Sequence, residues 1–453
     1  MAQYDAVFGM DQETLNGLIA TFYGNARGLF DRNYANIGDF SNVEVDIQAP
    51  PTVSLRPMDR YRDEAHQLAS PHVSGPELEA AIEQLTSGLM TVNCSQVLVK
   101  LTSQGQTQNV QCSAACNAAV SVQPAGSQQL LVMVLSDGVI NVPNNPALGS
   151  QLTQQAAPAV LGFMNWMLSN LRIPMISVFN VNFSTAVVAT ESAAGHNYLV
   201  AYTGLSPVSP PNPGTSWPAG QAFVGVDAAA INAVINQMLP NPNGSGGTSS
   251  PNLSWDYSIG LNNANVTVNP GQGSLMSINV NVGGSASITY HTPNSLPNVG
   301  FGASVGGSVT ANCILEASTS GPNQNVIAVI NSISNVNLSI GINGLPGWLN
   351  WIVGEVTGAL ASALSPVISN ALAGRQFPVY TIQPIPFNFI GFSLELLLSQ
   401  AQLTQISGAA GEALATAVAQ PRFVPASQVP LTTSVKTGKP QRQVARAKAA
   451  AHH

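Results

Sequence analysis

The sequence predicts an α+β fold assembled from two tandem copies of one strand-helix-sheet-helix unit. Three observations lead to this prediction. A segment near the N-terminus recurs 216 residues later, proline-rich segments interrupt the chain, and strand-like alternation fills the stretches between helical segments. Strands and helices that occur in separate runs, without regular β–α–β alternation, are typical of α+β proteins.

The internal repeat is the strongest of these observations. Residues 6–22 read AVFGMDQETLNGLIATF, and residues 222–238 read AFVGVDAAAINAVINQM. Five of the seventeen aligned positions are identical: Ala6/Ala222, Gly9/Gly225, Asp11/Asp227, Asn16/Asn232 and Ile19/Ile235. Because a recurring segment of this kind marks a repeated supersecondary unit, we expect two similarly folded halves.

Each copy predicts a short strand that runs directly into an amphipathic helix. The strand ends at Asp11 or Asp227, whose carboxylate can accept hydrogen bonds from the first free N–H groups of the helix. Apolar residues then recur at i, i+3, i+4 and i+7, so that one helix face is buried. They are Leu15, Leu18, Ile19 and Phe22 in the first copy, and Ile231, Val234, Ile235 and Met238 in the second.

A second helix is expected later in each half, at residues 152–171 and 348–372. Each of these apolar-striped segments ends near a lone arginine, Arg172 or Arg375. A cation at a helix C-terminus complements the partial negative charge of the exposed carbonyl groups, so we expect both arginines to cap helices.

The rest of both halves predicts antiparallel strands, because alternating or β-branched runs are separated by Gly, Asn and Pro. The clearest strand signals are 43–49, 96–102, 128–136, 171–178, 255–261, 264–269, 275–282, 285–291, 302–318 and 375–382.

Breaks in this pattern suggest the domain boundaries. Residues 206–220 contain five prolines, which cannot continue a helix or a central strand, and we expect them to link a first domain at 1–205 to a second at 221–408. Residues 240–251 (PNPNGSGGTSSP) are expected to form a flexible loop. Residues 409–453 lose hydrophobic periodicity and are expected to form a disordered tail.

The charge distribution argues against nucleic acid as a partner. Only 8% of residues are charged, and between Leu101 and Pro421 the basic residues are Arg172 and Arg375 alone. Nucleic-acid surfaces need clustered Lys and Arg. Such residues gather instead at the C-terminus, where we expect them to contact an anionic membrane or a protein partner. They are Arg422, Lys436, Lys439, Arg442, Arg446 and Lys448.

The sequence shows none of the common catalytic, cofactor or metal motifs, so we expect no enzyme activity, no cofactor and no metal site. A hydrolase with an unusual site would need convergent His and carboxylate residues, which are scarce and scattered here. The four cysteines are expected to be buried or incidental thiols. The N-terminus lacks the features of a secretory signal, and the apolar stretch 345–372 is interrupted, so we expect a cytoplasmic protein or non-classical export.

The order of elements, occurring twice, resembles that of the tubular lipid-binding (TULIP) superfamily. Residues 4–10, running into the first helix, are similar to the opening of the P47-like bacterial proteins found beside clostridial neurotoxins. Residues 222–227 are similar to the start of the second barrel in proteins like the bactericidal/permeability-increasing protein (BPI), and residues 389–396 fit the same pattern. The resemblance covers about residues 1–408, whereas the signal peptide and disulfide of secreted animal members have no counterpart.

This resemblance implies two tandem TULIP-like units, each a highly curved antiparallel sheet wrapped around a long helix, with a second helix. It also implies binding of a phospholipid or fatty acid in an apolar groove between helix and sheet, with lipid transfer as a further role. The P47-like proteins in addition imply membership of a toxin-associated complex. The alternative is a scaffold protein that keeps the fold but has a filled groove. Lipid content distinguishes the two.

A groove of this kind needs adaptable apolar side chains. The candidates are Leu18, Phe22, Phe163, Met164, Met167, Ile235, Met238, Trp351, Ile352 and Val356. For any one of them taken singly, ordinary core packing is the favoured interpretation. The headgroup candidates are Arg56, Arg60 and Arg62, in a charged segment that is expected to be a solvated loop.

Overall fold

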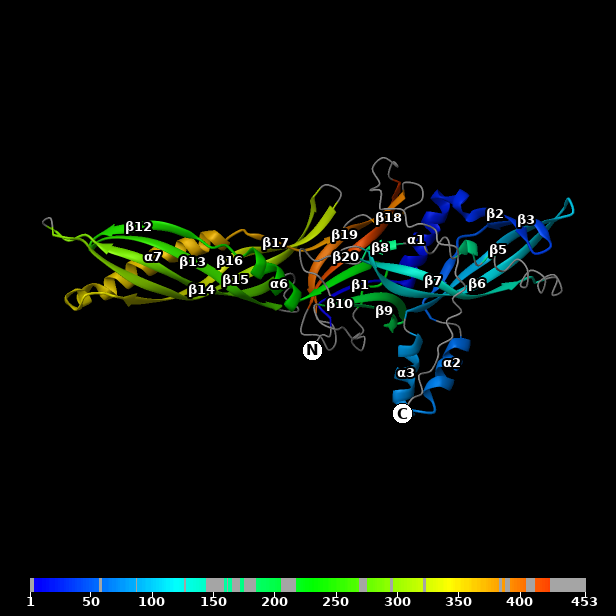
Figure 1. The fold of residues 1–453 in the computed structure, drawn as a ribbon, viewed down its shortest axis with the longest axis horizontal. Helices are drawn as coiled ribbons and strands as arrows, with labels where there is room; N and C mark the ends of the chain where they lie inside the picture. The colour runs from blue at the N-terminus through cyan, green and yellow to red at the C-terminus, as the bar shows by residue number, and fades with distance from the viewer. Residues whose placement is uncertain are drawn as a thin grey trace.

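The protein is an elongated α+β molecule in which three antiparallel sheets follow one another along the long axis (Figure 1). The predicted α+β class is therefore confirmed. The computed structural model describes residues 4–56, 59–86, 88–125, 128–143, 159–160, 162–164, 172–174, 185–204, 217–268, 275–293, 296–320, 323–382, 385–387, 392–404 and 412–423.

Both halves of the chain contribute to the middle sheet, whose strand order is β18-β19-β20-β11-β1-β10-β9. The first half supplies β1 (Ala6–Asp11), β9 (Thr185–Ala193) and β10 (His196–Gly204). The second half supplies β11 (Ala222–Asp227), β18 (Ile385–Phe387), β19 (Phe392–Thr404) and β20 (Glu412–Phe423). The two copies of the repeated strand, β1 and β11, are antiparallel neighbours at the centre.

The register of β1 and β11 reveals a local twofold relation between the two halves. Phe8 pairs with Val224, the residue aligned with it in the repeat. A local twofold axis therefore passes between these two residues. On either side the next strand is also antiparallel, β10 beside β1 and β20 beside β11, so the sheet is built outward in the same way from its centre.

Close contact at this centre explains why position 9 is glycine. Gly9 lies opposite Phe223 in the β1–β11 ladder. A Cβ atom at position 9 would lie 2.3 Å from Cζ of the Phe223 ring, which is closer than carbon atoms can approach. Only glycine therefore allows the Phe223 ring to pack against this strand.

The first half contains one terminal sheet, with the order β2-β3-β5-β6-β7-β8 and with β4 paired to β5. Its strands are β2 (Asp31–Ile37), β3 (Phe40–Ile47), β4 (Thr52–Ser54), β5 (Leu89–Ser103), β6 (Gln106–Ala125), β7 (Gln128–Asn141) and β8 (Arg172–Pro174). Helix α1 (Gln12–Asn25) and the 3₁₀ helix η1 (Arg27–Phe30) precede them. Of the helix predicted at 152–171, residues 159–160 and 162–164 are described, and they are helical.

Between β4 and β5 a helical hairpin, α2 (Asp59–Ala69) and α3 (Pro76–Thr86), projects from the side of the molecule (Figure 1). The prediction of a solvated loop for this charged segment was wrong. Ala65, Ala69 and Ile82 are buried although most of their neighbours are exposed. Because the buried stripe of α2 consists of alanines, it gives little hydrophobic periodicity in the sequence.

The second half contains the other terminal sheet, with the order β12-β13-β14-β15-β16-β17. Its strands are β12 (Asn243–Ser249), β13 (Asn252–Val268), β14 (Leu275–Tyr290), β15 (Val299–Ser320), β16 (Asn323–Asn343) and β17 (Gln376–Ile382). Its helices are α6 (Ala228–Met238), the 3₁₀ helix η3 (Gly347–Ile352) and α7 (Val353–Leu372). Register shifts within the β15–β16 ladder mark β-bulges, which bend and twist long strands.

The edge strand β12 replaces the flexible loop that was expected at 240–251, so that prediction was wrong. Gly244 and Gly246 pair with Tyr257 and Trp255. A Cβ at either glycine would lie within 3 Å of the partner's side chain, at 2.6 Å and 2.7 Å respectively. The glycines thus allow two aromatic side chains to pack across the strand, a role that composition alone does not reveal.

The predicted helix ends are confirmed where the side chains are described. The Thr14 N–H donates to Asp11 Oδ1 at 2.7 Å, and the Ala230 N–H donates to Asp227 Oδ1 at 2.8 Å. At the other end of α7, Arg375 Nε donates to the Ala371 carbonyl at 2.8 Å. The side chain of Arg172 lies outside the described residues.

Helix α7 together with η3 is long and apolar enough, by length and composition, to cross a membrane. Every fourth residue from Val356 to Leu372 is at most 1% exposed. This row packs toward β16, which contacts α7. One face of this helix is therefore buried in the second half, although only 28% of its apolar window is buried.

The ordered chain continues beyond the expected boundary at residue 408. Strand β20 (Glu412–Phe423) lies between β19 and β11 in the middle sheet. Its sequence is rich in alanine, which has a weak strand propensity, and this explains why residues 409–423 were assigned to the tail. The remaining tail lies outside the described residues, and its contact with a membrane or protein stays a prediction.

The close approach at Gly9 leads to a stability prediction. We expect Gly9→Ala to lower the free energy of unfolding by about 1–3 kcal/mol, because the new methyl group must displace the Phe223 ring. Gly17 is the matched control, because it is exposed on α1 and an added Cβ there would meet nothing within 4 Å. Gly17→Ala should leave stability unchanged or raise it by up to about 1 kcal/mol. Urea unfolding measures both, and equal effects would contradict the packing argument.

Candidate functional site

Side chains of α6, η3 and α7 pack into the core of the second half. On α6, Ile231, Val234 and Ile235 are at most 1% exposed. Ile352 of η3 and Val356 of α7 are equally buried. Three of the groove candidates, Ile235, Ile352 and Val356, therefore belong to a packed core in this structure.

The corresponding face of α1 in the first half is less covered. Leu15 is buried like its repeat equivalent Ile231. Further along the helix, Leu18 and Ile19 are only half-buried, although their equivalents on α6 are fully buried. Phe22 is also half-buried. The two halves thus share a helix but differ in how completely its apolar face is covered.

Other apolar side chains of the first half are half-buried in the same way. They lie on η1, β2 and β3 and pack against the same core cluster. We call this set the α1–β2 strip: Leu18, Ile19, Phe22, Leu29, Tyr34, Ile37 and Phe40. Partly exposed apolar side chains that adjoin a core in this way are a common feature of ligand-binding grooves.

A basic residue adjoins the strip. Arg32 lies two positions before Tyr34 on the edge strand β2, so both side chains are on the same face of the sheet. The Arg32 guanidinium carbon lies 6.0 Å from the centroid of the Tyr34 ring, and burial raises the pKa of the Tyr34 hydroxyl. In the ladder, Arg32 and Tyr34 pair with the buried Val45 and Val43.

Sequence reasoning missed Arg32 and Tyr34. The usable signal was the short alternation at the start of DRNYANI, in which Arg32 and Tyr34 are half-buried between exposed neighbours. It was too short and too polar to be recognised as a strand, since Asn and Asp are rare in strands.

The other groove candidates are dispersed. Phe163 and Met164 are fully buried, and Met164 Sδ lies 3.0 Å from Sγ of Cys116. Met238 is half-buried at the end of α6. Trp351 is 62% exposed and so lies outside the packed interior. Met167 lies outside the described residues.

The headgroup candidates do not share one site. Arg56 donates from Nη2 to Ser192 Oγ at 2.7 Å and from Nε to Asn197 Oδ1 at 3.1 Å, at the β9–β10 hairpin. Arg62 forms an exposed ion pair with Glu79 across the α2–α3 hairpin, at 2.6 Å. The side chain of Arg60 lies outside the described residues.

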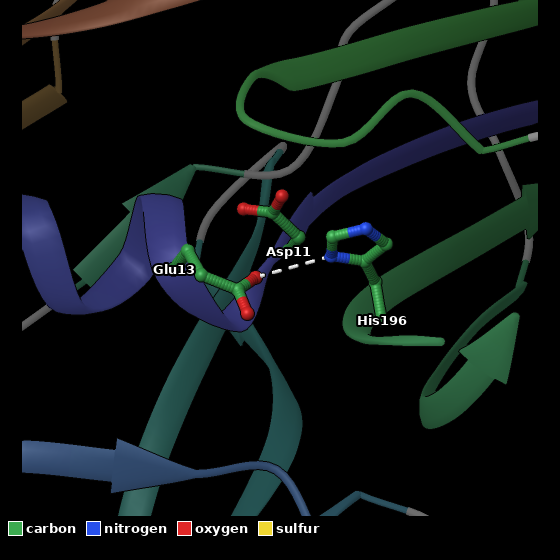
Figure 2. Close-up of side chains that lie close together, drawn as sticks. All are labelled: Asp11, Glu13 and His196. Atoms are coloured by element: carbon green, nitrogen blue, oxygen red, sulfur yellow. Dashed lines mark ion pairs between the residues drawn. The ribbon is translucent and has the colours of Figure 1, made fainter. Parts of the chain in front are cut away.

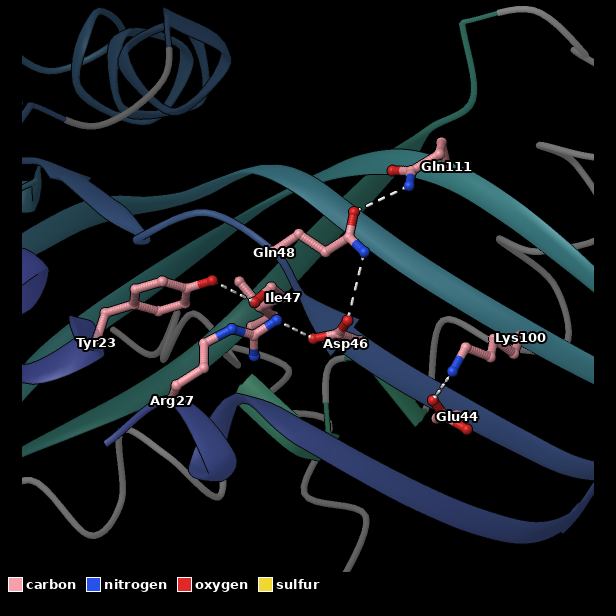
Figure 3. A network of polar contacts seen from close by, with 8 residues as sticks. All are labelled: Tyr23, Arg27, Glu44, Asp46, Ile47, Gln48, Lys100 and Gln111. Atoms are coloured by element: carbon pink, nitrogen blue, oxygen red, sulfur yellow. Dashed lines mark hydrogen bonds and ion pairs between the residues drawn. The ribbon is translucent and has the colours of Figure 1, made fainter. Parts of the chain in front are cut away.

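A polar network covers the other face of β3 (Figure 3). Glu44 and Asp46 alternate with the buried Val43, Val45 and Ile47, and they form ion pairs with Lys100 and Arg27. Tyr23 at the end of α1 donates its hydroxyl to the Ile47 carbonyl at 2.9 Å. These contacts fasten α1 and η1 to the sheet edge beside the strip, and the charges in them are already paired.

Asp11, Glu13 and His196 form a cluster of metal-ligand type at the start of α1 (Figure 2). His196 Nδ1 lies 3.5 Å from Glu13 Oε2. Both oxygens of Asp11 already accept backbone hydrogen bonds, Oδ1 from Thr14 and Oδ2 from Gly220. Asp11 therefore connects α1 to the segment that enters β11. Of the three side chains, Glu13 and His196, both partly exposed, would remain as ligands for a metal ion.

The four cysteines are buried free thiols. Burial raises the pKa of Cys94 and of Cys313 to about 12 and that of Cys112 to about 11. At neutral pH these three groups are protonated, and they are poor nucleophiles and poor metal ligands.

No family model matches the sequence, and no curated protein matches it. Among solved structures the chain is similar to P47 of Clostridium botulinum E1, with 9% identity and a TM-score of 0.44, over 92% of this chain and 99% of that one. It is also similar to P47 from Clostridium botulinum A2, with 9% identity and a TM-score of 0.42, over 91% of this chain and 97% of that one. A third match is a lipopolysaccharide binding protein, with 12% identity and a TM-score of 0.32, over 92% of this chain and 99% of that one.

The raised thiol pKa values predict low reactivity. A pKa of about 12 instead of 9.0 reduces the thiolate fraction about 1000-fold. We therefore expect the native protein to react very slowly with a disulfide reagent at about pH 8. After unfolding in denaturant all four thiols should react. Rapid stoichiometric labelling of the native protein would contradict the buried placement.

Asp227 predicts a pH dependence of stability. Burial raises its pKa from 3.8 to about 6, against the lowering effect of the Ala230 N–H. The folded state therefore binds the proton more tightly than the unfolded state. The protonated Asp227 side chain therefore adds to the free energy of unfolding. This added stability is fully present below the pKa that Asp227 has in the unfolded state, and it is lost as the pH rises through about 6.

Asp227→Asn keeps an N-cap acceptor but removes this titration. Between about pH 7.5 and about pH 4.5, wild type should gain stability relative to the variant by on the order of 1–2 kcal/mol. Asp256→Asn, which replaces an exposed carboxylate, serves as the control. Parallel stability profiles of wild type and Asp227→Asn in urea unfolding would show that Asp227 has no raised pKa.

Proposed function

We propose that this chain is a non-enzymatic lipid-binding protein that holds acyl chains along the α1–β2 strip of its first half. The observation that supports the proposal is the difference between the two copies of one helix. Leu18 and Ile19 stay half-buried, whereas their equivalents Val234 and Ile235 are at most 1% exposed. An apolar ligand on the strip would complete the coverage that protein side chains provide in the second half.

The energetics are adequate for such a ligand. Each buried methylene contributes about 0.8 kcal/mol, so ten methylenes contribute about 8 kcal/mol before the costs of ordering. The strip offers aliphatic and aromatic side chains over three successive elements, α1, η1 and the β2–β3 hairpin. Burial of the acyl chain therefore supplies most of the affinity.

Arg32 and Tyr34 give the strip a polar end. A guanidinium group binds phosphate and carboxylate oxygens strongly, and a phenol can donate a further hydrogen bond. We therefore infer that the first half prefers acyl lipids with an anionic headgroup, either a phospholipid or a fatty acid.

A second candidate function is that of a scaffold protein with a filled interior. The packing of Ile235, Ile352 and Val356 into the core of the second half supports it, since these three groove candidates are already covered by protein side chains. In that case the first half would hold no lipid either, and the fold would serve protein contacts alone. Lipid content decides between the two functions.

The direct test is native mass spectrometry of the purified protein, followed by solvent extraction and lipid identification. Wild type should carry lipid at near-integer stoichiometry. The double variant Leu18→Gln/Phe22→Gln should show about tenfold lower occupancy or less, because two apolar contacts of the ligand are lost. The matched control is Leu68→Gln/Leu85→Gln, which changes two exposed leucines on α2 and α3.

A wild-type protein that stays free of lipid after incubation with mixed lipids would favour the scaffold function. Unchanged occupancy in the Leu18/Phe22 variant would place the lipid elsewhere. Urea unfolding of all variants separates loss of lipid from loss of fold.

The headgroup preference is tested separately with Arg32→Gln. We expect this change to lower the ratio of anionic to zwitterionic lipid recovered by about tenfold, because the guanidinium contact to the headgroup is lost. Total lipid occupancy should fall less, because the contacts to the acyl chain remain. Arg62→Gln, on the α2–α3 hairpin, is the control. An unchanged lipid class in Arg32→Gln would exclude Arg32 as the headgroup contact.

A further inference from the structure

The free end of the second half carries exposed apolar side chains. The β14–β15 hairpin closes at the pair Tyr290 and Val299, and Gly302 pairs with Asn343 at the end of β16. The loop after Tyr290 and the segment that leads into η3 therefore lie at the same end of the sheet. In Figure 1 the start of the α7 helix lies at the outer end of the molecule, away from the middle sheet.

The 3₁₀ helix η3 presents two tryptophans to solvent. Trp348 and Trp351 are 63% and 62% exposed, while Leu349 and Ile352 are fully buried. A 3₁₀ helix has three residues per turn, so side chains at i and i+3 lie one above the other. Both tryptophans are therefore on one face, and the two buried residues anchor the opposite face to the core. We call Trp348 and Trp351 the tryptophan tip.

The surroundings of the tip carry almost no charge. No Lys, Arg, Asp or Glu occurs from residue 257 to 315 or from 317 to 354. Glu355, one turn after Trp351, is the first charged residue on the helix. A partner attracted by charge, such as nucleic acid or a strongly acidic or basic protein, has no counterpart here.

The size of the tip also limits its partner. Two tryptophans with about two thirds of their surface exposed offer on the order of 300 Å². A stable contact with a second copy or another protein buries about 800 Å² on each side. A bilayer has no such minimum, because a few interfacial side chains enter it individually, and tryptophan favours the boundary between headgroups and acyl chains.

We propose that the tryptophan tip docks this protein on the surface of a lipid bilayer, by inserting Trp348 and Trp351 at the level of the headgroups. The docking does not depend on charge, and it is a property separate from lipid binding in the first half. A protein with both interiors filled would still dock. If the first half does hold lipid, the tip orients the long axis of the molecule relative to the membrane from which that lipid comes.

The test is binding of full-length protein to vesicles of phosphatidylcholine alone and to vesicles that also contain phosphatidylglycerol. Wild type should bind both, with little effect of salt, because charge contributes little. Trp348→Ser/Trp351→Ser should bind phosphatidylcholine vesicles at least about tenfold more weakly, because the inserted apolar area is lost. Leu68→Ser/Leu85→Ser, at equally exposed positions on the α2–α3 hairpin, should bind like wild type.

Tryptophan fluorescence gives a second readout. Lipids brominated on the acyl chain should quench wild type, and the Trp348/Trp351 variant should lose that quenching although three tryptophans remain. Vesicle binding that is unchanged in this variant, or absent in wild type, would overturn the proposal. A wild-type dimer that becomes monomeric in the variant would overturn it as well, since the tip would then be a contact between copies. Lipid extraction from each variant shows separately whether lipid is held in the first half.

Discussion

The antiparallel pairing of β1 with β11 is the constraint on which the rest of the structure depends. It places Phe8 opposite its own repeat equivalent Val224, so that each half extends outward from one local axis. Hydrogen bonds are added on both sides by β10 and β20. Because Gly9 leaves room for the Phe223 ring, the two strands can approach without a clash. The helices that follow β1 and β11 consequently start from equivalent positions.

The two helices also attach to their sheets in the same way. Asn16 Oδ1 accepts a hydrogen bond from the Val53 N–H, and its equivalent Asn232 accepts one from the Val266 N–H, both at 2.6 Å. From this common base the halves diverge. The second half buries Val234 and Ile235 of α6, whereas the first leaves their equivalents Leu18 and Ile19 half-buried on α1. Binding is therefore expected in one half, and membrane contact at the far end of the other.

The sequence predicted the repeat, the α+β class, both N-caps and the helix at 348–372, because these follow from local periodicity and capping chemistry. It did not predict α2, β12 or β20. These elements depend on tertiary contacts: alanines buried between two helices, glycines beneath aromatic rings and an alanine-rich strand between two neighbours. The α1–β2 strip could not be predicted either, because incomplete burial becomes visible only when equivalent helices are compared in space.

Photo-crosslinking tests the central claim, that lipid occupies the first half alone, most directly. A fatty acid or phospholipid with a diazirine on its acyl chain would be incubated with the protein, irradiated, and located by peptide mass spectrometry. The account predicts labelled peptides from α1 to β3, residues 12–47, and no labelling of α6 or α7. Labelling that is distributed equally over both halves, or confined to α7, would contradict it.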